Sequence, residues 1–167
     1  MSFLLSIAKV EKVMVQLSAI AVVGRSSKPL YTEVFEKESA DTVLAIEFLM
    51  YASLDVCEEI VASVAAQQSN TTSAKQSGGV LGAKPFLSDL LQDRGYETWG
   101  YQTSCGTRII VATKGAQTKG ADRDDVERKL KAINEEVSRA LCSPFRDPEE
   151  NLGSSARFLS QLSRLRQ

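Results

Sequence analysis

Apolar residues recur along this chain in short runs and alternations that predict five strands. Residues 17–24 are almost wholly apolar and rich in Ile, Val and Ala, as expected for a strand buried on both faces. A turn at residues 24–29 leads to a returning strand over residues 30–35. Three further strands, joined by short turns into an antiparallel meander, are predicted over residues 85–91, 96–103 and 107–113.

Three other segments show helical periodicity. The first extends from a cap at Ser39 or Asp41 to about residue 67. The second opens on acidic residues at 122–125, which suit the positive end of a helix dipole, and it stops at Pro144. The third covers residues 154–165. The resulting order, ββα-βββ-αα, predicts an α+β fold in which an antiparallel five-stranded sheet is flanked by helices.

Each predicted helix carries an apolar stripe that we expect to face the sheet. In the first helix the stripe is Val43, Ile46, Met50, Leu54, Cys57, Val61 and Val64. In the second it is Val126, Leu130, Ile133, Val137 and Leu141, and in the third Phe158, Leu162 and Leu165. On the solvent side of the second helix we expect the i,i+4 ion pairs Asp124–Arg128, Asp125–Lys129 and Glu127–Lys131.

The first helix carries a second apolar set on roughly the opposite side. It consists of Leu44, Phe48 and Tyr51, and Asp55 continues the same line. A helix that is apolar on two sides is either buried or covered by another protein. Two interpretations follow: loops of this chain cover the second stripe, or these four residues bind a partner.

Two segments fall outside this pattern. Residues 1–15 form an N-terminal extension that could lengthen the first strand or form a short helix. Residues 67–82 are mostly Ser, Thr, Asn, Gln and Gly, so an insertion at about 68–84 is predicted to be a mobile loop that is dispensable for folding. Residues 16–167 are therefore expected to be a single domain.

Composition excludes several classes of protein. The net charge of −1 leaves no global electrostatic footprint for nucleic acid. The chain has no histidine, and its three cysteines lie far apart, so no zinc-binding pair occurs. An odd number of thiols without a secretory signal favours a cytoplasmic location. No run approaches the roughly 18 apolar residues that a membrane span requires, and the tail arginines allow peripheral membrane contact at most.

No catalytic, metal or cofactor site is predicted. Without histidine the usual general base is missing, and no nucleophile motif occurs. The glycine-rich residues 77–84 lack the phosphate-loop spacing and indicate a flexible linker. Cys105 is expected at an exposed hairpin tip, where its reactivity stays open, whereas Cys57 and Cys142 are expected in the core. A cysteine-dependent enzyme is thus a distant alternative.

Residues 142–148 (Cys-Ser-Pro-Phe-Arg-Asp-Pro), followed by Ser-Ser-Ala-Arg-Phe at 154–158, stand apart from the rest of the chain. In the simplest interpretation Pro144 ends a helix, and the aromatic side chain of Phe145 packs into the core next to the helix end. The signature positions are Pro144, Phe145, Pro148 and Phe158. We expect the tail to dock on the domain, with both phenylalanines buried.

The same segment resembles the C-terminal signature of the sedlin family, the small subunits of the TRAPP vesicle-tethering complexes. Residues 53–59 (Ser-Leu-Asp-Val-Cys-Glu-Glu) are similar to a run in that family's first long helix. Residues 99–103 (Trp-Gly-Tyr-Gln-Thr) resemble the hairpin of its subunit 2-like branch. The resemblance covers roughly residues 16–165, and the extension and the polar insertion depart from it.

The resemblance implies a longin-like (SNARE-like, profilin-like) fold and a non-catalytic role. The implied function is that of a subunit or assembly adaptor of a TRAPP complex, an exchange factor for Rab GTPases in ER–Golgi and Golgi traffic. Its partners would be other TRAPP subunits and, indirectly, a Rab GTPase, at the cytoplasmic surface of those membranes. The alternative is a longin-domain regulator of SNARE or adaptor-complex machinery outside TRAPP. The family's aspartate maps onto Asp55.

Overall fold

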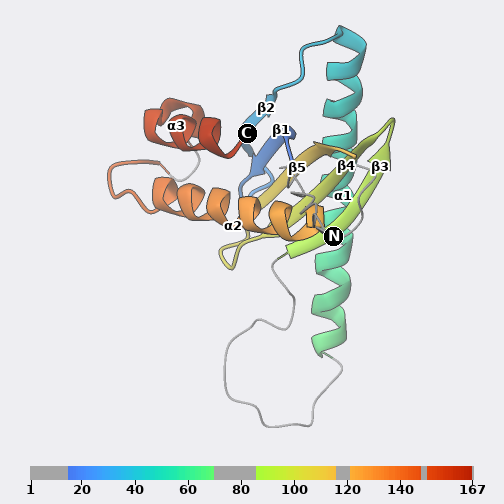
Figure 1. Cartoon of the computed structure of the whole chain (residues 1–167). Coiled ribbons are helices and arrows are strands. Elements are labelled where there is room, and N and C mark those ends of the chain that lie inside the picture. The colour runs from blue at the N-terminus through green and yellow to red at the C-terminus, as the bar shows by residue number, and fades with distance from the viewer. Residues whose placement is uncertain (1–14, 70–85, 116–120, 148–149, 167) are drawn as a thin grey trace, which may run out of the picture.

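The computed structural model describes residues 15–69, 86–115, 121–147 and 150–166, and Figure 1 shows their arrangement. The strands are β1 (Leu17–Val23), β2 (Pro29–Val34), β3 (Phe86–Asp93), β4 (Tyr96–Gln102) and β5 (Arg108–Lys114). The helices are α1 (Ala40–Ser69), α2 (Ala121–Leu141), the short 3₁₀ helix η1 (Leu152–Ser154) and α3 (Ala156–Leu165). This order confirms the predicted α+β arrangement.

The five strands form one antiparallel sheet in the order β2-β1-β5-β4-β3. Helix α1 lies on one face, and α2 and α3 cover the other (Figure 1). Both faces of the central strands are therefore buried, which explains why all seven residues of β1 are apolar or small. Ala19 and Ala21 point toward α1, whereas Ile20 and Val22 point toward α2 and α3.

Tight turns join the strands of the meander. Arg94 and Gly95 both have positive φ, 50° and 83°, as a two-residue hairpin turn of type I′ requires, and this confirms the predicted turn between β3 and β4. Gly100, in the middle of β4, faces Leu90. A Cβ at this glycine would lie 2.9 Å from Leu90 Cδ1, so a larger residue would require the Leu90 side chain to move.

Helix α1 begins one residue after Ser39, as expected from the capping pattern. The Asp41 N–H donates to Ser39 Oγ at 3.2 Å, and the Val43 N–H donates to the Ser39 carbonyl at 3.1 Å. The helix ends at Ser69, slightly beyond the predicted end. On its inner side Ile46, Met50 and Cys57 are buried, as predicted.

The predicted stripe of α2 is confirmed, but two of its ion-pair residues are not on the solvent side. Val126, Leu130, Ile133 and Val137 are buried. Asp125 and Lys129 are also buried, because the backbone of Val15 lies between them. The Val15 N–H donates to Asp125 Oδ2 at 3.3 Å, and Lys129 Nζ donates to the Val15 carbonyl at 2.5 Å.

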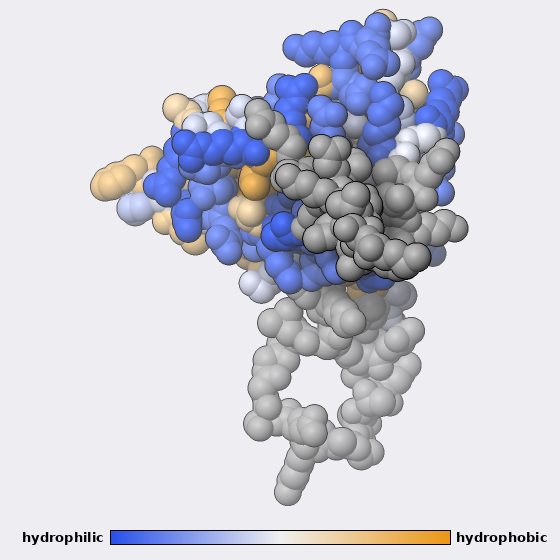
Figure 2. All heavy atoms as spheres, viewed as in Figure 1, coloured by the Kyte–Doolittle hydropathy of each residue, from blue (hydrophilic) through white to orange (hydrophobic). Residues whose placement is uncertain are grey.

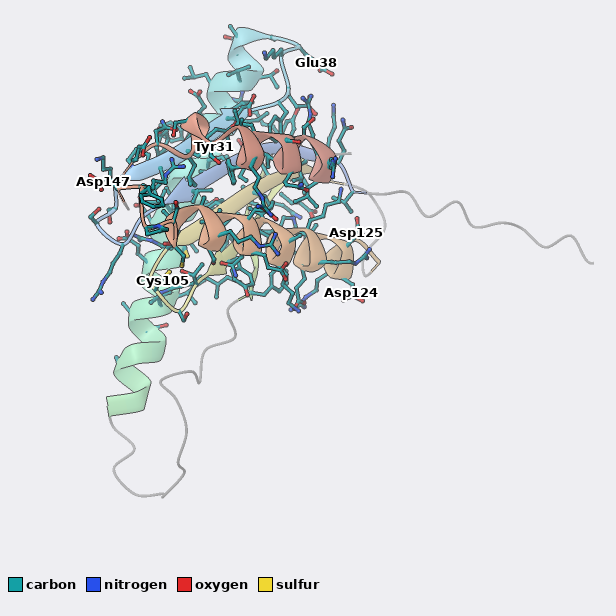
Figure 3. The ribbon with its side chains drawn as sticks, turned by 90° about the vertical axis from the view of Figure 1, so that its left-hand side faces the viewer. Tyr31, Glu38, Cys105, Asp124, Asp125 and Asp147 are labelled. Atoms are coloured by element: carbon teal, nitrogen blue, oxygen red, sulfur yellow. The ribbon has the colours of Figure 1, made fainter. Side chains whose placement is uncertain are left out.

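The remaining α2 pairs differ in part from the prediction. Lys131 pairs with Glu127 at 2.7 Å, as expected. Arg128 pairs with Asp125, three residues before it, at 2.8 Å. The prediction had paired it with Asp124, four residues before it. Asp124 and Asp125 both lie in the first part of α2 (Figure 3).

The prediction for the tail is half correct. Phe158 is 2% exposed and packs edge-on against Tyr31 with ring centroids 5.2 Å apart. Phe145, by contrast, is 98% exposed, so its predicted burial is wrong. The physical reason is that Arg146, the next residue, turns inward and leaves Phe145 at the surface. Pro144 is exposed as well, and Pro148 lies outside the described residues.

Other expectations meet a similar limit or correction. Cys142 is exposed, not in the core, because α2 ends at Leu141 and the chain turns away. The N-terminal extension up to residue 14 and the insertion at 70–85 lie outside the described residues, so the predictions for them stay untested. Within the described residues, no helix is long and apolar enough to cross a membrane.

Candidate partner-binding site

The outer side of α1 carries the apolar stripe that the sequence pattern predicted. Leu44, Phe48 and Tyr51 are 64%, 76% and 59% exposed, and Asp55 is exposed at the end of the same line. None of the segments that the structure describes covers these four residues, which we call the α1 patch. Exposed aromatic and aliphatic side chains gathered on one helix face are typical of an interaction site.

Packing on the opposite side of α1 explains why this stripe points outward. Ser53 is fully buried there, and its Oγ donates to the Leu49 carbonyl at 2.7 Å and lies 2.6 Å from Thr98 Oγ1 in β4. Cys57, one turn on, is also fully buried, and burial raises the pKa of its thiol, so it acts as a small apolar residue. The inner stripe fixes the rotation of the helix and thereby the direction of the α1 patch.

A polar contact with the first residue of β5 also holds this helix. The Arg108 guanidinium, from β5, is nearly buried and forms an ion pair with Glu58 of α1. It also donates to Ser27 Oγ in the β1–β2 turn at 3.0 Å. The sequence pattern did not reveal this contact, because the residues are 50 and 81 positions apart. Its consequence is that α1 is tied to two separate parts of the sheet.

The α1 patch continues into a groove with a volume of about 450 Å³. One wall is α1, and the other is the turn between β3 and β4, with Asp93 and Arg94. Leu44 and Phe48 line the groove, whereas Tyr51 and Asp55 lie farther along the helix outside it. The structure therefore adds a charged second wall that sequence reasoning missed, since nothing in the pattern placed the hairpin beside the start of α1.

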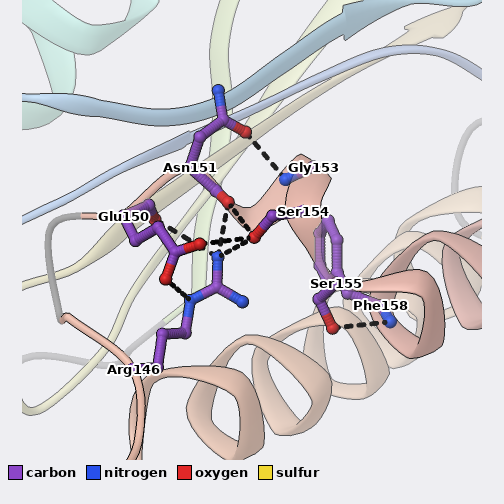
Figure 4. A network of polar contacts seen from close by, with 7 residues as sticks. All are labelled: Arg146, Glu150, Asn151, Gly153, Ser154, Ser155 and Phe158. Carbon is purple, nitrogen blue, oxygen red and sulfur yellow. Dashed lines mark hydrogen bonds and ion pairs between the residues drawn. The ribbon is translucent and has the colours of Figure 1, made fainter.

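The signature segment after α2 is held by one largely buried arginine side chain, that of Arg146 (Figure 4). Arg146 donates to the carbonyl oxygens of Glu150 and Asn151 and, at 3.1 Å, to Ser154 Oγ. Asn151 Oδ1 accepts the Gly153 N–H at 2.7 Å and caps η1, and Ser155 Oγ accepts the Phe158 N–H at 3.3 Å and caps α3. These contacts turn the chain so that Phe158 reaches the core.

The exposed Phe145 lies on the turn that this arginine secures. Figure 2 shows a mainly hydrophilic face with an apolar protrusion at the end of the molecule where the loop between α2 and α3 lies. Pro144 and Phe145 are exposed there. The signature residues thus divide: Phe158 stabilises the fold, whereas Phe145 and Pro144 form a surface feature.

Cys105 lies at the β4–β5 hairpin tip, as predicted, and is exposed (Figure 3). Partial burial raises the pKa of its thiol, but hydrogen bonds with the hydroxyls of Thr103 (3.0 Å) and Thr107 (3.6 Å) and with backbone amides outweigh burial, so the pKa falls below its usual value. In the part of the chain that is described, no cluster of three or more His, Cys, Asp or Glu residues could hold a metal ion.

Comparisons with known proteins agree with this architecture. The family model for sedlin matches residues 22–167, which is most of the chain. The trafficking protein particle complex subunit 2-like protein of Dictyostelium discoideum is 21% identical over 153 residues, covering 91% of this chain and 97% of that protein. The five-stranded antiparallel sheet flanked by helices is the longin-like fold expected of this family. The chain belongs to the sedlin family.

Proposed function

We propose that this chain is a non-catalytic subunit or assembly adaptor of a TRAPP vesicle-tethering complex. The family match supports this proposal, as does the similarity to a TRAPP-named protein over nearly the whole length of both chains. Sedlin-family proteins are structural subunits of trafficking complexes and are not known as enzymes. In this role the chain contributes binding surfaces, and exchange activity on a Rab GTPase belongs to the assembled complex.

The observation that carries the proposal is the α1 patch. Leu44, Phe48 and Tyr51 expose three large side chains in a row on a helix that the sheet holds firmly from behind. Burying each such side chain against another protein stabilises a complex by roughly 1.5–3 kcal/mol before the entropy of association is subtracted. Exposure of these side chains to water does not stabilise the isolated domain. We therefore expect a second protein to bury them.

Asp55 makes the two ends of the α1 patch chemically different. An exposed carboxylate at one end of an apolar row pairs with a donor on the partner and so fixes register, while the rings supply contact area. At the other end, Asp41, Asp93 and Arg94 border the groove with charge. We infer that the partner is another TRAPP subunit that presents apolar residues between polar ends.

The cellular context is part of the same proposal. We place the chain in the cytoplasm, peripherally at ER–Golgi and Golgi membranes, where it reaches a Rab GTPase indirectly through the complex. The alternative role, a longin-domain regulator of SNARE or adaptor-complex machinery, predicts a different set of associated proteins.

The test combines Tyr51→Ala with Asp55→Lys in the full chain, followed by affinity purification from cells and identification of TRAPP subunits by mass spectrometry. The parent should recover TRAPP subunits and the double variant should lose them, while circular dichroism shows that it remains folded. A matched control, Leu159→Ala with Arg164→Glu, changes an exposed apolar residue and a charge on α3, and it should bind like the parent. Recovery of SNARE or adaptor-complex proteins by the parent, in place of TRAPP subunits, would overturn the proposal.

A further inference from the structure

A second pocket lies between the end of α2 and the start of α3, on the other side of the sheet from the α1 patch. Its volume is about 390 Å³. Its lining includes Glu136, Arg139, Ser143, Arg146, Glu150 and Arg157. Three arginines outnumber two glutamates in this lining, so the pocket favours an added negative charge.

Ser143 lines this pocket and belongs to a turn whose next two residues are open to solvent. It is half-buried, and the two residues after it, Pro144 and Phe145, are exposed. The Arg146 N–H donates to the Ser143 carbonyl at 3.2 Å, which closes a turn beyond the last residue of α2. No helix or strand hydrogen bonds therefore have to break for an enzyme to reach this serine, since the segment belongs to neither.

The local sequence matches a known chemical preference. Proline-directed protein kinases transfer phosphate to a serine or threonine followed by proline, and many favour a basic residue three positions after the acceptor. Pro144 meets the first condition, and Arg146 meets the second in sequence, although its side chain is turned inward in the folded chain. The other three prolines of the chain follow lysine or aspartate, so Ser143 is the only serine or threonine in the sequence that precedes a proline.

We propose that Ser143 is a phosphorylation site for a proline-directed kinase and that the arginines of the adjoining pocket hold the phosphate. In the transfer, Ser143 Oγ forms a bond to the γ-phosphorus of ATP, the bond from that phosphorus to the β–γ bridging oxygen breaks, and ADP and a proton leave. This site is separate from the α1 patch and does not rest on the proposed TRAPP function.

Two of the three arginines in the pocket have a donor available for a phosphate, whereas Arg139 Nη1 already donates to Glu136 Oε1 at 2.6 Å. Among the described residues, Arg146 Nε is a buried donor without a hydrogen-bond acceptor, and Glu150 Oε2, with which it forms an ion pair, is 3.8 Å away. Arg157 Nε lies 3.7 Å from Glu136 Oε2, which is also too long for a hydrogen bond. A phosphate supplies three acceptor oxygens and commonly forms one to three charge-assisted hydrogen bonds with such arginines.

The dipoles of α2 and α3 have opposite effects on the stability of a phosphate at this site. A phosphate after the last turn of α2 faces the negative end of that helix, which by itself disfavours it. The start of α3, with Ser155, lines the same pocket and presents the positive end of a helix. Because Arg157 belongs to α3 and Arg139 to α2, a phosphate held by both ties the two helices together and should stabilise the domain.

The first experiment incubates the folded full chain with a purified cyclin-dependent kinase and magnesium ATP, and mass spectrometry locates the phosphate. We expect stoichiometric phosphate on Ser143 and none in Ser143→Ala. The heat-denatured full chain is the control for kinase activity. If the kinase modifies only the denatured chain, or neither form, Ser143 is not an accessible site in the native protein and the proposal is wrong.

The second experiment compares the melting temperatures of the phosphorylated and unmodified protein. Phosphorylation should raise the midpoint by about 2–4 °C and should bring the second pKa of the phosphoserine, seen by ³¹P NMR, below about 6. Arg157→Gln should reduce both effects, whereas Arg164→Gln, which lies two turns farther along the same helix and does not line the pocket, should not. An unchanged or lower midpoint, or equal effects of the two arginine variants, would show that the pocket does not hold the phosphate.

Discussion

Ser53 Oγ of α1 lies 2.6 Å from Thr98 Oγ1 of β4, and both side chains are fully buried. Thr98 Oγ1 also accepts the Leu91 N–H and lies 3.1 Å from the Leu91 carbonyl in the edge strand β3. A single buried hydroxyl therefore joins α1, β4 and β3. It does so at the point where the ladder between β3 and β4 shifts register, between Leu87 and Leu91.

Thr98→Val should lower the free energy of unfolding by about 1–3 kcal/mol, because it leaves the Leu91 N–H and the Ser53 hydroxyl without this buried partner. Ser53→Ala should cost less, about 0.5–1.5 kcal/mol. Urea unfolding of both variants measures the difference. Ser104→Ala, at the exposed hairpin tip, is the control and should change stability by under about 0.5 kcal/mol. Equal losses in Thr98→Val and Ser104→Ala would contradict the role of this hydroxyl.

The two phenylalanines of the signature segment should respond differently to truncation. Phe158→Ala should destabilise the domain by about 3–5 kcal/mol, since the ring is 2% exposed and packs against Tyr31. Phe145→Ala should change stability by less than about 0.5 kcal/mol, because the ring is 98% exposed. Denaturant unfolding of the two variants provides the measurement. A large loss for Phe145→Ala would mean that this ring is buried in solution.

Tyr31 should make stability sensitive to alkaline pH. Burial, followed by the hydrogen bond and charge of Glu33, raises the pKa of the Tyr31 phenol above its usual value of about 10. Above pH 10 the unfolded chain loses this proton while the folded chain keeps it, so stability is complete below pH 10 and falls as the pH rises further. Tyr31→Phe keeps the ring and should remove that part of the loss.

Unfolding free energies at pH 9 and pH 11 test this. The parent should lose more stability between the two values than Tyr31→Phe does. Tyr51→Phe, which changes an exposed tyrosine, serves as the control and should behave like the parent. An identical pH response of the parent and Tyr31→Phe would show that the phenol is not perturbed.

Cys105 and Cys57 should differ strongly in reactivity toward iodoacetamide. Cys105 is exposed, and the hydroxyls around its sulfur lower the pKa of the thiol despite partial burial, whereas burial raises the pKa of Cys57. Mass spectrometry of the folded protein should find rapid alkylation at Cys105 and none at Cys57. Thr103→Val removes one of those hydroxyls and should slow the alkylation of Cys105. If Thr103→Val does not change the alkylation rate of Cys105, the hydrogen bonds are not the cause of its reactivity.

Much of this architecture is encoded locally. The order of strands and helices, the Arg94–Gly95 turn and the buried stripe of α2 all follow from hydrophobic period and turn chemistry, which act over a few neighbouring residues. The exposed α1 patch could also be predicted, because a sheet can cover only one side of a helix. The predicted line of Leu44, Phe48, Tyr51 and Asp55 is exposed as a unit.

Only the tertiary structure decided which polar residues lie inside. The sequence pattern predicted that Asp125 and Lys129 face solvent and that Phe145 is buried in the core. All three predictions were wrong. Asp125 and Lys129 are buried because the backbone of Val15, 110 or more positions away, needs their hydrogen bonds. Phe145 is exposed because Arg146 satisfies carbonyl oxygens of the η1 turn from within. Backbone groups far apart in sequence must be paired once buried, and that requirement does not appear in any local pattern.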